Sequence, residues 1–404
     1  MRVVLFCHSL VSDWNHGNAH FLRGVCSELI ARGHEVAVHE PADSWSVSNL
    51  VAEHGEAPLR AFAAAYPQLR SERYTPQALD LDAALADADL VLVHEWNEHA
   101  LVRRIGLHRA AHPHYKLLFH DTHHRSVTEP DSMAAYELRH YDGVLAFGSV
   151  IRDLYRRHGW CERAWTWHEA ADTRVFKPAA MCVIPAKAGI QGAQASSGTE
   201  ALDSRLRGND EEAQPGGDLV WIGNWGDEGR TAELHQFLLE PVKSLALKAR
   251  VHGVRYPQHA LASLREAGID YGGWLPNHEA PNVFARYGVT VHVPRRPYVR
   301  ALPGIPTIRV FEALACGIPL VSAPWDDCEG LFEPGADFLV ARDGREMREH
   351  LRAVLNDPAL ARALAEHGLR TIEARHSCSQ RVDELLAIHQ ELVAPARASP
   401  EVNA

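Results

Sequence analysis

Residues 302–322 read LPGIPTIRVFEALACGIPLVS, and this stretch predicts a loop, a helix and a strand in succession. Gly304 and the prolines beside it favour a loop, and Thr307 is suited to the N-cap of the helix that follows. Gly317 marks the expected end of the helix, because glycine readily adopts the left-handed conformation found there. The apolar residues after it predict a buried strand. A helix followed directly by a buried strand is typical of an α/β domain.

Short apolar runs alternate with helical segments along both halves of the chain. Runs that are apolar on both faces are typical of parallel strands covered by helices. They form two series, one at 3–6, 36–38, 90–93, 116–119 and 144–147 and the other at 219–223, 249–253, 289–293 and 319–322. The sequence therefore predicts two successive α/β domains. Ligands bind such sheets at the carboxyl ends of the strands, so the loops there are the candidates for function.

Charge and composition exclude several classes of protein. The 404 residues carry a formal net charge of −11, which argues against sequence-independent binding of nucleic acid. The 26 histidines and 7 cysteines show no ligand spacing, so we expect reduced thiols and no metal site.

The N-terminal sequence predicts where the protein resides. Its first apolar run ends at Cys7, which is too short for a signal peptide or a membrane span. We therefore expect a cytoplasmic protein without an integral membrane segment. Three arginines on a helical pattern at 151–158 suit either a solvated helix or peripheral binding to the inner face of the membrane.

Arg309 and Glu312 lie three positions apart on the expected helix and therefore share one face. By spacing alone they form an ordinary surface ion pair. The loop before the helix has a second use, because its backbone N–H groups and the helix N-terminus suit an anion such as a diphosphate.

The run from Arg309 to Ser322 resembles the nucleotide-sugar-binding segment of group 1 glycosyltransferases, and most closely their spore-maturation-type branch. This resemblance implies the GT-B architecture, in which two Rossmann-like domains face a central cleft and the C-terminal helices pack back on the first domain. In the family, two glutamates with seven residues between them bracket the loop. Glu312 matches the second, which binds the ribose, whereas Gly304 occupies the first position, which lies near the donor sugar.

The resemblance also implies an activity. It predicts a hexosyltransferase-type enzyme that moves a sugar from a nucleotide-diphosphate sugar to an acceptor, without a metal or another cofactor. The acceptor class stays open between a glycan, a lipid-linked glycan, a protein and a metabolite. Two other functions also stay open, namely a sugar-nucleotide epimerase with the same fold and a non-catalytic, two-lobed protein that binds sugars or nucleotides.

Several glycine-rich or basic segments complete the expected donor site. Gly223 and Arg230 follow a strand where the resembling enzymes contact the diphosphate, and Trp274 falls where they hold the nucleotide base. Simple turns, a core tryptophan and a solvated basic loop are the alternatives for these segments. The expected donor-binding residues are Gly17, Gly223, Asn224, Arg230, Trp274, Arg300, Gly304, Arg309 and Glu312.

The segment after the strand at 116–119 is the candidate for catalysis. It contains His120, Asp121 and His123. An imidazole or carboxylate at a strand's carboxyl end can accept the proton of an acceptor hydroxyl, since an alcohol is a poor nucleophile without a base. We expect these three residues to be catalytic, with a helix cap or a metal cluster as the alternatives.

Domain boundaries follow from the two series of strands. The stretch at 167–178 resembles the segment that leads from the first domain to the second in these enzymes. Residues 181–217 predict a flexible insertion, within which 183–191 and 202–211 resemble the translation of a dispersed bacterial repeat element. The expected division is an acceptor-side domain at 1–176, a linker with this insertion at 177–217, a nucleotide-sugar-binding domain at 218–375, and a C-terminal helix and tail at 376–404.

Overall fold

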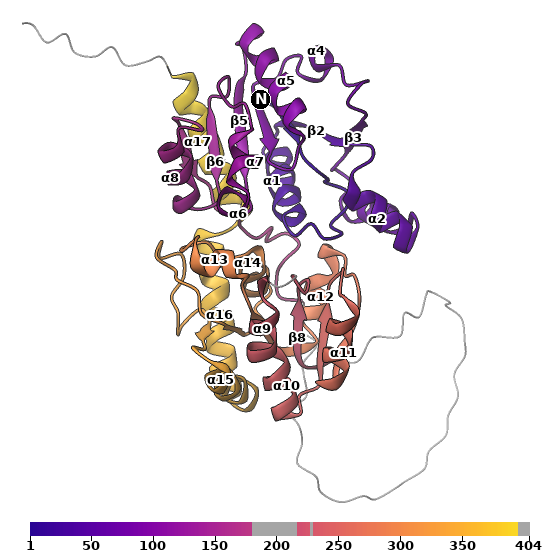
Figure 1. Ribbon diagram of the computed structural model, residues 1–404, viewed down its shortest axis with the longest axis vertical. Helices are drawn as coiled ribbons and strands as arrows, with labels where there is room; N and C mark the ends of the chain where they lie inside the picture. Colours follow the sequence, from indigo (N-terminus) through magenta and orange to yellow (C-terminus); the bar gives the residue numbers. More distant parts are fainter. Residues whose placement is uncertain (180–215, 227–228, 395–404) are drawn as a thin grey trace, which may run out of the picture.

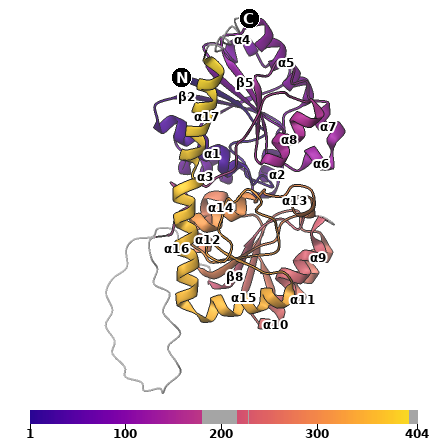
Figure 2. The same ribbon diagram turned by 90° about the vertical axis from the view of Figure 1, so that its left-hand side faces the viewer.

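The computed structural model describes residues 1–179, 216–226 and 229–394. These residues form two α/β domains, one above the other in Figure 1 and Figure 2. Most of the expected insertion at 181–217 lies outside the described residues.

The first domain is built on a seven-stranded sheet in which all paired strands are parallel. Its order is β3 (Ser71–Tyr74), β2 (Glu35–Pro41), β1 (Arg2–Phe6), β4 (Leu90–His94), β5 (Lys116–Asp121), β6 (Gly143–Ala146) and β7 (Ala164–Thr166). The chain reverses its direction of progress between β1 and β4. Such a switch point opens a crevice at the carboxyl ends of the strands.

Helices cover both faces of this sheet. They are α1 (Ala19–Ala31), α2 (Trp45–His54), α3 (Ala57–Ala65), α4 (Leu81–Ala84), α5 (His99–Ala111), α6 (Arg125–Thr128), α7 (Pro130–Ala134) and α8 (Ser149–His158). Alternate residues of β1 divide between two apolar clusters. Val3 and Leu5 pack in the cluster of α1, whereas Val4 and Phe6 pack in the cluster that contains α5 residues. This explains why the strand is apolar at successive positions.

The second domain repeats the strand order of the first. Its six-stranded parallel sheet runs β10 (Ile269–Tyr271), β9 (Ala249–His252), β8 (Gly217–Ile222), β11 (Tyr287–His292), β12 (Leu320–Ser322) and β13 (Leu339–Val340). The switch point lies between β8 and β11. The loops after β1 and after β8 therefore hold corresponding positions in the two domains.

The helices of the second domain and the C-terminal part are α9 (Thr231–Leu234), the π-helix η2 (His235–Leu239), α10 (Glu240–Leu245), α11 (Gln258–Glu266), the 3-10 helix η3 (Asn277–Glu279), α12 (Ala280–Phe284), α13 (Arg296–Arg300), α14 (Ile308–Ala315), α15 (Gly344–Asn356), α16 (Pro358–Arg375) and α17 (Cys378–Val393). The loop, helix and strand predicted at 302–322 are present as the loop before α14, α14 and β12. Among the described residues, no helix combines the length and apolar composition that a membrane crossing needs.

The last helix ties the two domains together. Figure 2 shows α16 running along the second domain and α17 continuing onto the first. Ser377 begins α17 with a capping box that it forms with Gln380. Trp167 then donates an indole hydrogen bond of 2.8 Å to the carbonyl of Arg381.

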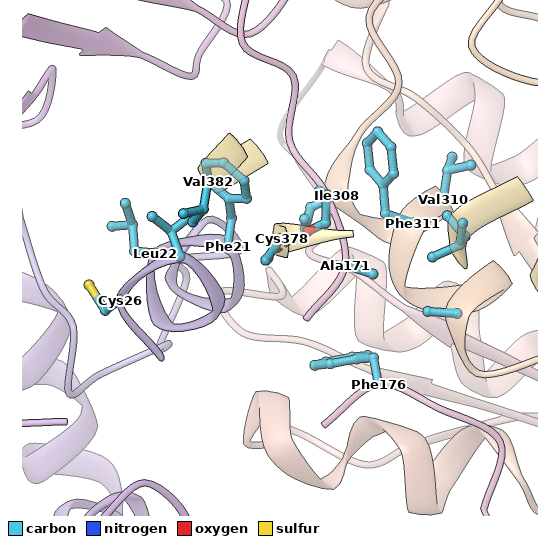
Figure 3. Packing of buried hydrophobic residues seen from close by; sticks show 14 of the residues in the cluster. Phe21, Leu22, Cys26, Ala171, Phe176, Ile308, Val310, Phe311, Cys378 and Val382 are labelled. Atoms are coloured by element: carbon cyan, nitrogen blue, oxygen red, sulfur yellow. Dashed lines mark hydrogen bonds between the residues drawn. The ribbon is translucent and has the colours of Figure 1, made fainter. Parts of the chain in front are cut away.

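One apolar cluster continues from the first domain into the second. Figure 3 shows Phe21 and Leu22 of α1 beside Val382 of α17, with Ile308 and Phe311 of α14 further along. Two parallel-sheet domains, linked in this way by C-terminal helices, confirm the predicted fold class.

Candidate functional site

A pocket lies between the two domains, where the loops after β1, β8 and β9 meet. These loops follow the carboxyl ends of their strands, so the pocket occupies the position expected for a ligand in both sheets. It is lined by Asp13, Asn15, His16, Gly17, Ile222, Gly223, Asn224, His252, Gly253, Val254, Trp274, Leu275, Asn277 and Arg309.

Asp13 connects the first domain to the wall of this pocket that contains Trp274 and Asn277. Its carboxylate accepts hydrogen bonds of 3.0 Å from the Trp274 indole and 3.0 Å from the backbone N–H of Asn277. Arg23, which is almost fully buried, pairs with the same carboxylate at 2.8 Å. Trp274 is therefore held in the interface by a polar contact, as well as by its ring contact with His54 of α2.

The loop after β8 brings backbone close to the first domain. Asn224 donates its side-chain amide to Asn15 of the first domain, and its amide oxygen accepts from the N–H of Val254 at 2.8 Å. A Cβ on Gly253 would collide with the carbonyl of Gly223, so these two loops pack too closely for a larger residue. The pocket floor is thus made largely of main chain.

Arg230 supports this loop from below. Its guanidinium donates hydrogen bonds to the carbonyls of Val293 at 2.9 Å, Trp225 at 3.3 Å and Asn224. It also lies 5.0 Å from the centre of the Trp221 ring. Among the described residues no carboxylate pairs with it.

Two further guanidinium groups approach Arg230. Burial, and then the charges of Arg295 and Arg309, lower the pKa of Arg230 to about 9. A Cβ placed on Gly226 would lie 2.8 Å from the Nε of Arg230 and 3.1 Å from the Nε of Arg295. In the part of the chain that the structure describes, Arg295 has no carboxylate partner either. The cleft therefore contains a cluster of positive charge that suits a diphosphate.

Glu312 lies directly behind the pocket and is fully buried. It accepts a 2.9 Å hydrogen bond from His20 of the first domain, pairs with Arg309 one helical turn earlier, and lies 3.5 Å from the side-chain amide of Asn277. Burial alone would raise its pKa, but the Arg309 charge and the His20 hydrogen bond hold the pKa of Glu312 below its usual value. The expected surface ion pair therefore has a fully buried carboxylate that contacts both domains, whereas its arginine is partly exposed.

Glu169 is a second buried carboxyl at this interface. The side-chain amide of Asn18 donates a 2.6 Å hydrogen bond to it. Burial raises the pKa of Glu169 to about 7, and the nearby charge of Glu312 adds to the rise. Arg309 and the backbone amide of Ile308, at the start of α14, partly oppose it. Glu169 therefore titrates near neutral pH at the helix N-terminus that the sequence predicts to bind an anion.

Gly304 shapes the loop before α14. It has a φ of +83° and donates its N–H to the carbonyl of Asp326 at 2.6 Å. A Cβ there would lie 2.8 Å from the Cγ of Glu329, whose carboxylate contacts His168 at 3.1 Å. Glycine is thus required both by the left-handed backbone and by this close side chain.

Of the three residues expected to be catalytic, His123 lies nearest the second domain. Burial lowers the pKa of His123 well below its usual value, followed by the charges of His124 and of Arg295 from the second domain. The neighbouring His124 ring lies 5.4 Å from the ring of Tyr298. Burial therefore favours the uncharged form of the His123 imidazole, and Arg295 of the second domain adds to this effect.

His120 and Asp121 are the last residues of β5 and are buried. His120 lines a small, mainly apolar cavity with Trp167 on the side of the sheet covered by α1, and burial lowers its pKa to about 3. Asp121 accepts hydrogen bonds from Tyr155 at 2.9 Å and from the N–H of His123 at 3.2 Å. Asp121 therefore fixes the orientation of the segment that contains His123.

Asp121 shares its site with Glu95, which follows β4. Burial raises the pKa of both carboxyls, to about 6 for Asp121, and each carboxyl perturbs the other. Glu95 also accepts a 2.8 Å hydrogen bond from the N–H of Thr122. Two adjacent buried carboxyls are most stable when one is protonated and the other is ionised.

The residues expected to bind the donor fall into three groups in the structure. Gly17, Gly223, Asn224, Trp274 and Arg309 line the pocket, and Glu312, Arg230 and Gly304 lie behind or beside it. Arg300 lies at the end of α13 with its side chain exposed. No local sequence pattern indicates a role for Asp13, His20, Glu169 or Glu329, because each contacts residues of the other domain.

Comparison with known proteins agrees with this geometry. Residues 230–387 match a protein family described as glycosyl transferase-like. The match covers most of the second domain and reaches into α17, and it includes Arg230, Arg309 and Glu312. No curated protein matches the chain significantly.

Several solved structures share the whole fold. A glycosyltransferase from Rickettsia africae superposes with a TM-score of 0.62 at 10% identity, over 98% of this chain and 99% of that one. Sucrose-phosphate synthase from Thermosynechococcus elongatus gives 0.60 at 13% identity, over 97% and 99%. The Anabaena protein HepE, solved with UDP, gives 0.60 at 13% identity, over 96% and 100%. The chain therefore has the GT-B fold.

Proposed function

We propose that this protein transfers a sugar, of the hexose type, from a nucleoside-diphosphate sugar to an acceptor hydroxyl without a metal ion. The observation that carries the proposal is the convergence of Arg230, Arg295 and Arg309 on the loop after β8. Of these three, Arg309 alone pairs with a carboxylate among the described residues. Such a cluster can neutralise a diphosphate in place of a divalent cation.

The donor's position follows from the lining of the pocket. The diphosphate lies on the loop at 223–226, where main-chain atoms allow close approach and Arg295 and Arg309 supply charge. The base lies between Trp274 and the loop after β9, and the ribose hydroxyls bind Glu312. Ribose binding replaces one of the hydrogen bonds that Glu312 now accepts, so donor entry requires a small movement of the two domains.

We infer that His123 is the base that accepts the proton of the acceptor hydroxyl. In the free protein the Arg295 charge contributes to the low pKa of His123. A bound diphosphate neutralises Arg295 and therefore makes His123 a stronger base when the donor is present. Asp121 positions the segment through the N–H of His123. Arginines then stabilise the charge that develops on the departing diphosphate.

The comparisons favour UDP as the first nucleotide to test. HepE from Anabaena was solved with UDP and with UDP-glucose, and an α-glucosyltransferase of the same fold was solved with UDP. We further place the chain near the spore-maturation-type branch, because Gly304 stands where the wider family has a glutamate. We also place it in the cytoplasm, where nucleotide sugars are the expected donors.

Two arginines of one segment allow a matched test of donor binding. Arg295 lies beside Arg230 in the cleft, whereas Arg300 is exposed at the end of α13. The stabilisation of the purified protein by UDP, GDP, ADP, CMP and dTDP is measured for wild type, Arg295→Gln and Arg300→Gln. We expect one nucleotide to raise the melting temperature of wild type and Arg300→Gln, but not of Arg295→Gln.

Other outcomes of this test are equally informative. Loss of the shift in Arg300→Gln alone would remove Arg295 from the donor site. A shift followed by conversion of the nucleotide sugar without any acceptor would identify an epimerase. Absence of a shift with every nucleotide would argue against a donor site in this cleft.

A further inference from the structure

Three side chains of the types that ligate metals meet at the end of the first domain that lies away from the second. Asp82 belongs to α4, and His108 and His112 lie in and directly after α5. Each offers one ligand atom, and these atoms lie within 4.8 Å of one another. Figure 1 and Figure 2 show α4 and α5 together at this end. The cluster is remote from the cleft, and the proposed transfer reaction does not use it.

Hydrogen bonds on both sides orient the His108 ring. Its Nε2 lies 3.1 Å from the Oδ1 of Asp82, and its Nδ1 lies 3.0 Å from the hydroxyl of the buried Tyr115. The side chain of His108 is only 9% exposed, so the ring has little freedom to turn. Metal-binding histidines typically have their second nitrogen held by such a polar partner.

The Nδ1 of His112 also has a hydrogen-bond partner. This nitrogen lies 3.1 Å from the backbone carbonyl of His108, and a carbonyl can only accept a hydrogen bond. The Nδ1 of His112 is therefore protonated, which leaves the lone pair on Nε2 of the neutral ring. The two rings stack with their centres 4.3 Å apart. One turn of helix thus presents two imidazoles side by side next to a carboxylate.

We propose that Asp82, His108 and His112 form a binding site for a divalent transition-metal ion of the zinc class. Zinc binds nitrogen and oxygen at about 2.0–2.2 Å, which places tetrahedral ligand atoms roughly 3.3 Å apart. One ring nitrogen of each histidine and one oxygen of Asp82 already lie within 4.8 Å of one another, and rotation of the exposed Asp82 and His112 side chains would bring the ligand atoms to this spacing. Two imidazoles and one carboxylate also exclude calcium and magnesium, which prefer oxygen ligands.

Binding requires one local proton rearrangement. The Nε2 of His108 gives up its proton to coordinate the ion, and its Nδ1 takes a proton and donates it to the oxygen of Tyr115. No net proton is released from His108, because the ring stays neutral. The ion then connects α4, before β4, with the end of α5, after β4, and leaves one position for water.

The test is a titration of tag-free protein with Zn²⁺ and Co²⁺, followed by calorimetry. His112→Ala is the principal variant, because this side chain is exposed and its loss should not affect folding. His114→Ala is the control, because His114 is also exposed and its ring lies 6.5 Å from that of His112. We expect one site per wild-type chain, with affinity at least tenfold lower in His112→Ala and in Asp82→Ala, and unchanged in His114→Ala.

Two results would overturn the proposal. The first is wild-type protein with no stoichiometric site, or with the same affinity as His112→Ala. The second is an equal loss in His114→Ala, which would show that exposed histidines bind the ion non-specifically. Nucleotide binding should be the same in wild type and His112→Ala, so the outcome is independent of the proposed transferase activity.

Discussion

His20 and Glu312 form a 2.9 Å hydrogen bond that joins the two domains, and both side chains are buried. The other nitrogen of His20, Nε2, accepts a 2.8 Å hydrogen bond from the backbone N–H of Asp172. The Nδ1 of His20 is therefore the donor to Glu312. The carboxylate that we propose for the ribose is thus held by the first domain in the absence of a donor.

Removing His20 should loosen this interface. His20→Ala removes one of the partners of the buried Glu312 carboxylate, which keeps Arg309 and Asn277, and removes the acceptor of the Asp172 N–H. We expect this to cost about 2 kcal/mol of stability. The measurement is the thermal denaturation of His20→Ala, with the exposed His114→Ala as control. A melting temperature equal to that of the control would show that the contact does not stabilise the interface between the two domains.

Glu169 should make stability depend on pH. Its pKa is about 7 in the folded protein, above the value of about 4.3 for a free glutamate, so folding favours the protonated form. This stabilisation is complete below pH 4 and is lost as the pH rises through 7, by about 4 kcal/mol in total.

The variant Glu169→Gln isolates this effect, because its amide stays neutral at every pH. The difference in melting temperature, variant minus wild type, should therefore increase from pH 5 to pH 8. A difference that stays constant across this range would show that Glu169 is already ionised when buried.

Gly304→Ala should destabilise the loop before α14. Gly330 also has a positive φ, of +62°, but a Cβ there would meet no atom within 4 Å. Gly330→Ala therefore measures the backbone penalty alone, about 1–2 kcal/mol. Gly304→Ala adds the collision with Glu329 and should cost more. Equal losses in denaturant unfolding would mean that Glu329 moves away freely.

Much of the fold could be predicted from local patterns. Apolar runs such as those of β1 and β4 indicated buried parallel strands. Gly317 comes directly after the C-cap residue of α14 and has a φ of +65°, as expected for a glycine that ends a helix. Local patterns did not indicate that the helical stretch after Arg230 is divided into α9, the π-helix η2 and α10. Thr307 occupies the N-cap position of α14, but its hydroxyl contacts His292 at 3.2 Å and does not cap the helix.

The candidate site was only partly predictable, because its contacts come from distant parts of the chain. The spacing of Arg309 and Glu312 indicated a shared face, but no local pattern reveals that His20 buries the pair. His120 shows a second reason why the site could not be fully predicted from the sequence. The strand continues through Asp121, so His120 shares a face with Leu118 and points into the core. Arg230 was expected to bind phosphate directly, yet its hydrogen bonds go to three backbone carbonyls.

The most direct test of the central claim is calorimetric titration of wild type and Glu312→Gln with the nucleoside diphosphates. Glutamine keeps the size of the side chain and an oxygen for the His20 hydrogen bond, so the fold should persist. We predict one binding site in wild type, selective for one base, and at least a tenfold loss of affinity in Glu312→Gln. Binding of equal strength in the variant, or no binding of any nucleoside diphosphate to wild type, would contradict a donor site at this cleft.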